Sequence, residues 1–171
     1  VMEAAAKNLT AVTLELGGKS PVIIDGSTNL NSTAEKVCWG KTLNSGQTCI
    51  APDFALVQEN ALDGFVEGFK RACEKFYDPD KKGIDQSKDY GRIINDTNFD
   101  RVQELLEDAK ENGAKVEFGG EVNKQDRYIQ PTLLSNINMQ MKIMQDEIFG
   151  PILPVVSFKN KEDVTELLNS Q

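Results

Sequence analysis

Short apolar runs alternate with longer amphipathic segments along this chain, and this order constrains the fold more than any other feature of the sequence. The short runs have the length and the apolar character of strands. The longer segments place apolar residues at the spacing of a helix face. A strand followed by a helix, repeated along the chain, is typical of an α/β domain whose sheet is largely parallel.

Local signals place the individual elements. Short apolar runs predict strands at residues 10–15, 21–24, 53–58, 115–118, 128–134 and 153–158. Helical spacing predicts helices at residues 32–43, 60–76, 97–112 and 160–171. A capping box at Ser32 and Glu35 begins the first helix, Asn60 caps the second, and Gly113 ends the third.

Both ends of the chain lack the signals that usually bound a helix. Residues 2–9 are helix formers that begin without a capping residue, and no terminator follows the helix predicted at residues 160–171. We therefore expect a longer protein that continues on both sides.

Charge and composition exclude several classes of partner. The 171 residues carry a net charge of −8 without a basic run, which argues against binding of nucleic acid or of an anionic membrane. No apolar stretch reaches the roughly 18 residues that a membrane span needs, and the N-terminus lacks a signal peptide. Three widely spaced cysteines do not suggest a disulfide framework, so we expect a reducing, cytoplasmic location.

The absence of histidine constrains the chemistry further. A Ser-His-Asp unit, a Cys-His unit and a histidine-based zinc site cannot be completed within this chain, and we expect no metal site. Any general base that the chain supplies must be a carboxylate, a lysine or a tyrosine.

The first candidate for chemistry is Cys49, in a small polar loop between a predicted helix and a predicted strand. Such loops commonly present reactive groups, and Gly46 allows a ligand to approach the backbone closely. A cysteine attacks as its thiolate, so the site should lower the thiol pKa or hold a base nearby. The context alone favours a catalytic and a structural cysteine equally, whereas Cys38 and Cys73 fit helix packing in the core.

Two carboxylates are further candidates. Glu15 interrupts an apolar run just before Gly17-Gly18, where a half-buried carboxylate with a raised pKa would suit a general base. Taken alone, an ordinary surface glutamate explains it better. Glu147 could accept hydrogen bonds from ribose hydroxyls, and Phe149 could pack on a flat cofactor. A solvated turn explains this second segment at least equally well.

Three segments of the chain occur together, in this order, in the aldehyde dehydrogenase superfamily, which the chain resembles over nearly its whole length. They are Glu15-Leu16-Gly17-Gly18-Lys19-Ser20-Pro21, Gly46-Gln47-Thr48-Cys49 and Glu147-Ile148-Phe149-Gly150-Pro151. The sequence after Cys49 is most similar to the class 3, or fatty aldehyde, branch. The resemblance implies an incomplete catalytic domain over residues 15–171, with a three-layer αβα fold and a largely parallel sheet. Residues 1–14 would be the tail of a preceding dinucleotide-binding region.

The resemblance also implies the oxidation of an aldehyde to a carboxylic acid with NAD or NADP. Cys49 would attack the aldehyde to give a thiohemiacetal, and hydride transfer would leave a thioester that water activated by Glu15 hydrolyses. The backbone N–H of Cys49 would be one oxyanion donor. Four residues would contact the cofactor: Glu147 at the nicotinamide ribose, Phe149 nearby, and the backbone of Leu16 and Gly17.

Part of the family's machinery lies outside this sequence, namely the phosphate and adenosine contacts and an asparagine oxyanion donor. We therefore expect the isolated chain to be inactive, and the full-length parent to be a homodimer as in class 3. Two alternatives remain open. One is a non-catalytic binding or structural protein of the same fold, and the other is an unrelated cysteine hydrolase that uses Glu15 as its base.

Overall fold

A five-stranded sheet forms the centre of the molecule. The computed structural model describes residues 1–169, and the strands lie in the order β1 (Pro21–Ile24), β2 (Phe54–Gln58), β7 (Ile152–Phe158), β6 (Thr132–Ser135) and β3 (Lys115–Phe118). The first four are parallel to one another, and β3 pairs with β6 in the antiparallel sense. This confirms the largely parallel sheet that the alternating sequence predicts.

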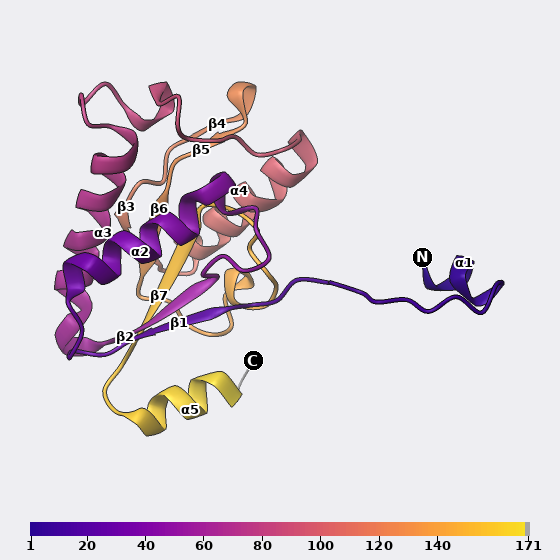
Figure 1. The fold of residues 1–171 in the computed structure, drawn as a ribbon. Coiled ribbons are helices and arrows are strands. Elements are labelled where there is room, and N and C mark those ends of the chain that lie inside the picture. Colours follow the sequence, from indigo (N-terminus) through magenta and orange to yellow (C-terminus); the bar gives the residue numbers. More distant parts are fainter. Residues whose placement is uncertain (170–171) are drawn as a thin grey trace.

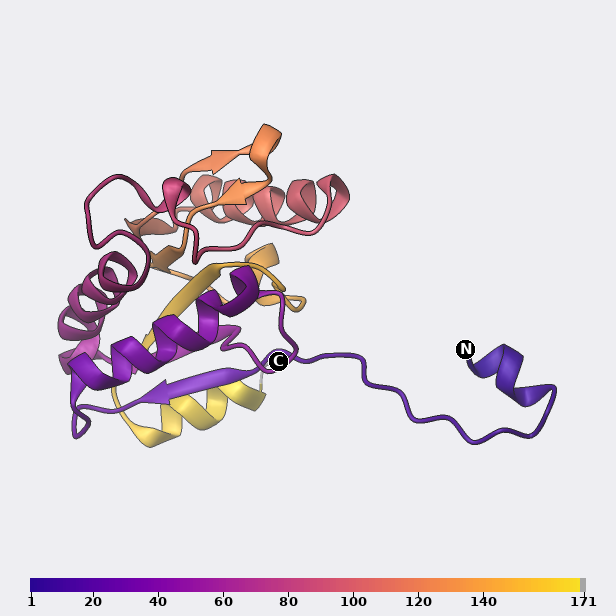
Figure 2. The same ribbon diagram turned by 45° about the horizontal axis from the view of Figure 1, so that its top comes forward.

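Helices cover both faces of the sheet, as Figures 1 and 2 show. The helices are α2 (Leu30–Thr42) and α3 (Leu62–Tyr77) on one face, and α4 (Asp96–Glu111) and α5 (Lys161–Asn169) on the other. The three-layer αβα architecture is therefore confirmed.

Strand β2 shows why its sequence is an uninterrupted apolar run. Ala55 and Val57 pack into the core beneath α2 and α3, whereas Phe54 and Leu56 pack into the core beneath α4. A strand that is buried on both faces needs apolar side chains at successive positions rather than at alternate ones.

Shorter elements connect these layers. They are the ribbon of β4 (Val122–Asn123) and β5 (Tyr128–Ile129), and the 3-10 turns η1 (Leu43–Gly46), η2 (Glu59–Ala61), η3 (Ile84–Gln86), η4 (Lys124–Asp126) and η5 (Lys142–Met144). Helix α1 (Met2–Ala6) lies apart from the body at the end of an extended segment (Figure 1). Within residues 1–169, no helix has the length and the apolar character needed to cross a membrane.

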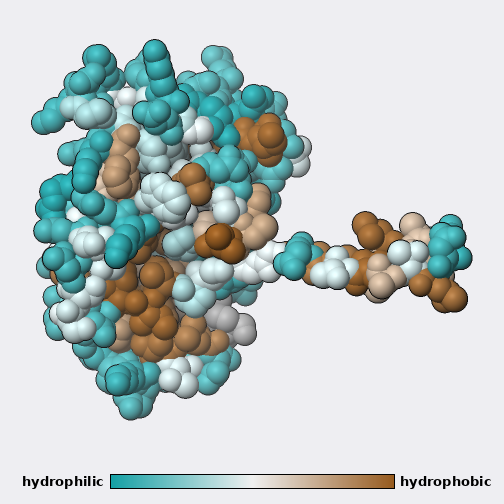
Figure 3. Space-filling model, viewed as in Figure 1, coloured by the Kyte–Doolittle hydropathy of each residue, from teal (hydrophilic) through white to brown (hydrophobic). Residues whose placement is uncertain are grey.

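The outer edge of the sheet, along β1, presents an apolar surface. Ile23 of this strand is 51% exposed, and Val22 is only partly buried. Figure 3 shows apolar side chains gathered where β1 lies in Figure 1.

Helices α2 and α3 run side by side in the same direction. Four contacts follow one another along them: Leu30 with Gly64, Ala34 with Gly68, Cys38 with Cys73, and Thr42 with Tyr77. A methyl group at Gly68 would come within 2.7 Å of the Ala34 side chain, so this glycine sets how closely the helices approach. Cys38 and Cys73 are both fully buried, which confirms their predicted place in the core.

The strand register brings the amino-terminal ends of the parallel strands together. Pro21 of β1 lies opposite Phe54 of β2, and the Asp53 N–H donates a hydrogen bond to the Ser20 carbonyl at 2.8 Å just before both strands begin. Strand β7 lies beside β2 in the same direction. The segments that precede β1, β2 and β7 therefore meet at the amino-terminal ends of these strands, which we call the amino-terminal edge of the sheet.

Two strand predictions are wrong. No strand forms at residues 10–15, because this stretch extends beyond the sheet edge without a neighbouring strand to accept its hydrogen bonds. The strand predicted at residues 128–134 is divided into β5 and β6. Pro131 lies at the division, and proline has no N–H to donate to a neighbouring strand.

Two helix starts are also wrong, although the helices are confirmed. The side chain of Asn29, and not Ser32, caps α2 by accepting the Ser32 N–H at 3.1 Å. The Glu35 carboxylate pairs with Lys75 instead of closing a capping box. Asn60 lies in η2 rather than at a cap of α3. The helix predicted at residues 160–171 is confirmed as far as Asn169, and its last two residues lie outside the described part of the chain.

Candidate functional site

The three segments singled out in the sequence meet at the amino-terminal edge of the parallel sheet. The segment around Glu15 precedes β1, the loop of Cys49 precedes β2, and the segment around Glu147 precedes β7. Ligands of open α/β sheets more commonly lie at the carboxyl ends of the strands, so this site occupies the less usual edge.

Cys49 lies in the loop between η1 and β2, as the sequence predicts, and its side chain is exposed. The residue is part of a tight turn in which the Ala51 N–H donates to the Thr48 carbonyl at 3.0 Å. Among residues 1–169, none accepts a hydrogen bond from the Cys49 N–H. The thiol is therefore accessible to a ligand, and the N–H is not used by another part of the described chain.

The approach to this turn contains unusual backbone conformations. Asn44 and Ser45 adopt φ of 52° and 54°, a left-handed conformation that non-glycine residues rarely adopt. Gly46 follows with φ of 75°, and a side chain there would overlap the Gly150 carbonyl. The loop of Cys49 is thus in direct contact with the segment before β7. Backbone strain of this kind is concentrated at functional sites in proteins.

Gln47 fixes the loop to a distant part of the chain. Its side-chain amide donates to the carbonyls of Asn44 at 2.9 Å and Arg92 at 3.1 Å. Its oxygen accepts the Ile94 N–H at 2.9 Å. The glutamine of this motif therefore positions the turn that carries Cys49 rather than pointing to solvent.

Glu15 lies in the extended segment before β1, and its side chain is exposed. The structure therefore shows the surface glutamate that the local sequence favours, and not the alternative of a half-buried carboxylate, although no strand forms at residues 10–15. Within residues 1–169 the carboxylate has no hydrogen bond or ion pair. Leu16 and Gly17 are exposed as well.

The half-buried Glu147 reaches the first of these segments. A methyl group at Gly17 would overlap the Glu147 carboxylate, so this carboxylate lies directly over the Gly17 α-carbon. Gly17 also has φ of 82°, which glycine adopts readily. At the next residue, Gly18, a methyl group would meet no atom within 4 Å. The structure therefore brings together Glu147 and Gly17, two residues predicted to contact a cofactor.

Phe149 is half-buried and has φ of 47°, a rare conformation for an aromatic residue. Arg101 of α4 holds the backbone of the two residues that precede Phe149. One Arg101 nitrogen donates to the Ile148 carbonyl at 2.7 Å and another to the Glu147 carbonyl at 3.5 Å. Arg101 is thus a supporting residue that the sequence does not reveal.

A buried ion pair connects all three segments. Lys19 Nζ lies 2.5 Å from Asp53 Oδ2, and Asp53 Oδ1 accepts the Ile148 N–H at 2.9 Å. Lys19 also donates to the carbonyls of Ile143 at 2.8 Å and Asp146 at 3.0 Å. The only local sign of this ion pair in the sequence is an acidic residue, Asp53, directly before the apolar strand β2.

Lys41, near the end of α2, is a second lysine beside this ion pair and is only 1% exposed. Burial lowers the pKa of its ammonium to about 8, and the charges of Asp53 and Glu147 act in the opposite direction. No pattern in the sequence distinguishes Lys41 from a surface lysine.

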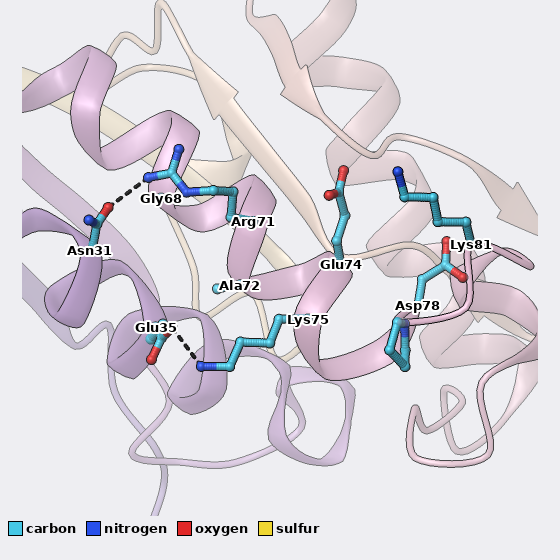
Figure 4. A pocket seen from close by; sticks show the side chains of 10 residues that line it. Asn31, Glu35, Gly68, Arg71, Ala72, Glu74, Lys75, Asp78 and Lys81 are labelled. Atoms are coloured by element: carbon cyan, nitrogen blue, oxygen red, sulfur yellow. Dashed lines mark hydrogen bonds and ion pairs between the residues drawn. The ribbon is translucent and has the colours of Figure 1, made fainter.

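A separate groove lies between α2 and α3, with a volume of about 510 Å³. Charged and polar side chains line it, and two pairs join the helices: Lys75 with Glu35 at 2.8 Å and Arg71 with Asn31 at 2.6 Å (Figure 4). None of its lining residues belongs to the three segments of the site. An open groove lined largely by charged and polar side chains does not suit an apolar ligand.

The fold and the site together define an α/β domain that presents a cysteine, an exposed Gly-Gly segment and a carboxylate at one sheet edge. The family model "Aldehyde dehydrogenase family" matches residues 1–171. The chain belongs to the aldehyde dehydrogenase family.

Individual relatives agree with this assignment. The chain is 48% identical to rat "Aldehyde dehydrogenase family 3 member A2" and 44% identical to dog "Aldehyde dehydrogenase, dimeric NADP-preferring". Both matches cover all of this chain and 34% and 36% of those proteins, respectively. A substrate-bound structure of AldH from Staphylococcus aureus is 40% identical, with a TM-score of 0.90 over 99% of this chain and 36% of that one. The chain thus spans about a third of these relatives, and the resemblance to the class 3, fatty aldehyde branch is confirmed.

Proposed function

We propose that the protein carrying this chain oxidises an aldehyde to a carboxylic acid with NAD or NADP, and that this chain supplies the nucleophile and the base. The observation that carries the proposal is the exposed Cys49, in a tightly held turn that follows two left-handed residues, at the same sheet edge as Glu15 and Glu147. Family membership supports the reaction class.

In this proposal the Cys49 thiolate attacks the aldehyde carbon, and a C–S bond forms. The resulting oxyanion accepts a hydrogen bond from the Cys49 N–H, which has no partner among residues 1–169. Loss of hydride from the same carbon leaves a thioester on Cys49. Glu15 then takes a proton from water, whose oxygen attacks the thioester and releases the acid and the thiolate.

The residues before β1 and β7 fit the nicotinamide end of a cofactor. The Glu147 carboxylate is half-exposed over Gly17 and could accept hydrogen bonds from ribose hydroxyls, while Phe149 packs nearby. The open side of Gly18 leaves room for a flat ring to approach the backbone of Leu16 and Gly17. When bound, the cofactor supplies the hydride acceptor.

The remaining features of the whole protein are part of the same proposal. We assign residues 1–14 to the tail of a dinucleotide-binding region and residues 15–171 to the catalytic domain. The separation of α1 from the body supports this division. We further propose a homodimer in the cytoplasm. The name of the dog relative, which describes that protein as dimeric, supports the proposed homodimer.

The test is formation of NADH or NADPH from a panel of aldehydes by the full-length protein. We expect turnover by the wild type, loss of turnover in Cys49→Ala, and a thioester that accumulates in Glu15→Gln. The isolated 171-residue chain should not turn over. A full-length protein that binds neither cofactor and oxidises no aldehyde would favour the non-catalytic alternative, and hydrolysis without cofactor would favour the cysteine hydrolase.

A further inference from the structure

We infer that Asp53 is a positioning residue that holds the Glu15 segment and the Glu147 segment in place relative to the Cys49 loop. The inference rests on the proposed function and adds to it a residue that contacts neither the substrate nor the cofactor.

The two oxygens of Asp53 serve two different segments. Oδ2 is paired with Lys19 Nζ at 2.5 Å, and Lys19 follows Glu15 by four residues. Oδ1 accepts the Ile148 N–H at 2.9 Å, and Ile148 is the residue after Glu147. Asp53 itself follows Cys49 by four residues. A single carboxylate is therefore bonded to the base segment and to the cofactor segment, from within the nucleophile loop.

The partners of Asp53 are fully committed to this arrangement. An ammonium has three N–H donors, and Lys19 uses them on Asp53, Ile143 and Asp146. The side chains of Lys19 and Asp53 are only 13% and 4% exposed, so water cannot readily replace either one. Removal of one partner would leave the other buried and uncompensated.

Stability alone does not explain why an ion pair lies here. Well-packed apolar side chains of similar volume stabilise a buried site as well as an ion pair does, or better. An apolar pair, however, could neither accept the Ile148 N–H nor anchor the chain that carries Glu15. The position of the ion pair between the three segments points to alignment of the site.

The experiment separates alignment from stability with three variants of the full-length protein: Asp53→Ala, Lys19→Met, and the double variant Lys19→Met/Asp53→Leu. Asp53→Ala removes both connections, whereas Lys19→Met leaves the bond from Ile148 to Asp53. The double variant removes both connections without leaving either Lys19 or Asp53 as an unpaired buried charge. The matched control, Lys124→Met/Asp100→Leu, makes the same change at an ion pair whose side chains are 61% and 53% exposed.

We expect Asp53→Ala and the double variant to raise KM for NAD(P) by about tenfold or more, since small misplacements of a site are this costly. Lys19→Met should lower kcat, through Glu15, with a smaller change in KM. The double variant should recover the melting temperature but not KM or kcat. Recovery of all three in the double variant would overturn the inference, as would a wild-type KM in Asp53→Ala after normalisation to active sites. If Asp53→Ala does not fold, the double variant alone decides.

Hydrogen exchange without cofactor gives a readout that does not depend on activity. In Asp53→Ala and the double variant, the Ile148 amide should exchange at least tenfold faster because it loses its acceptor, whereas Lys19→Met should leave its exchange close to that of the wild type. Unchanged exchange at Ile148 in the double variant would contradict the role of Asp53. If the variants show this exchange pattern but the wild-type protein oxidises no aldehyde, the proposed function is refuted and the role of Asp53 is left intact.

Discussion

The carboxylate of Glu147 lies against the α-carbon of Gly17, although 130 residues separate the two in the sequence. Gly17 can approach so closely because it has no side chain and because its φ of 82° is readily available to glycine. Within the described chain, this is the contact that joins two of the residues predicted to bind a cofactor.

Gly17→Ala should therefore displace Glu147. The added methyl group would overlap the carboxylate, and alanine disfavours this φ, so we expect KM for NAD(P) in the full-length protein to rise about tenfold or more. Gly113→Ala is the matched control, because Gly113 lies just after α4, also has a positive φ of 94°, and a methyl group there would meet no atom closer than 4.0 Å. Equal effects of the two substitutions would show that the contact with Glu147 is not the cause.

Alkylation of the 171-residue chain, followed by mass spectrometry, should modify Cys49 well before Cys38 and Cys73. Cys49 is exposed, whereas the other two thiols are fully buried 3.4 Å apart, and burial raises the pKa of Cys73. Comparison with Glu15→Gln over a range of pH tests whether Glu15 influences the thiol. Labelling of all three cysteines at one rate in the folded chain would contradict this placement.

Substitution of Gln47 should disturb the turn that presents Cys49. Gln47→Ala removes three hydrogen bonds, each worth about 1 kcal/mol, and we expect kcat of the full-length protein to fall at least tenfold. Gln47→Glu keeps the acceptor for the Ile94 N–H but loses both donated bonds, so its effect should be intermediate. The prediction fails if both variants keep kcat within twofold of the wild type.

Lys41 should make stability depend on pH in the alkaline range. Its pKa in the folded chain is about 8, below the ordinary value of 10.5, so the unfolded chain binds more protons between these values. Stability from this group is therefore low below pH 8 and increases as the pH rises from 8 to 10.5.

Lys41→Met should consequently raise the free energy of unfolding at pH 7 by up to about 3 kcal/mol. It should also flatten the pH dependence above pH 8 in urea unfolding experiments. Lys75→Met is the control, because Lys75 is 61% exposed beside Glu35. An unchanged alkaline slope in Lys41→Met would show that another group is responsible.

The elements that local patterns determine could be predicted from the sequence. The sheet, the helices on both of its faces and the loop position of Cys49 follow from apolar runs, helical spacing and a polar interruption between them. Local rules were insufficient where two residues compete for one task, as at the start of α2, where Asn29 rather than Ser32 is the cap.

The environment of the site could not be predicted in this way. Burial of Glu15 depends on what lies beside residues 10–15, and these residues have no neighbouring strand. The pairing of Lys19 with Asp53 spans 34 residues, and the contact of Asp53 with Ile148 spans 95. Such contacts arise from the strand order, which no local pattern of residue types encodes.

The pairing of the strands also sets the spacing of the site residues along the strand direction. The three segments of the site immediately precede β1, β2 and β7. Their relative positions along the strand direction are therefore fixed by the backbone hydrogen bonds between these strands. A slip of β1 by one residue against β2 would shift Lys19 by about 3.3 Å along the strand and turn the β1 side chains to the opposite face. Errors of strand pairing would therefore disable the site even where every helix had formed.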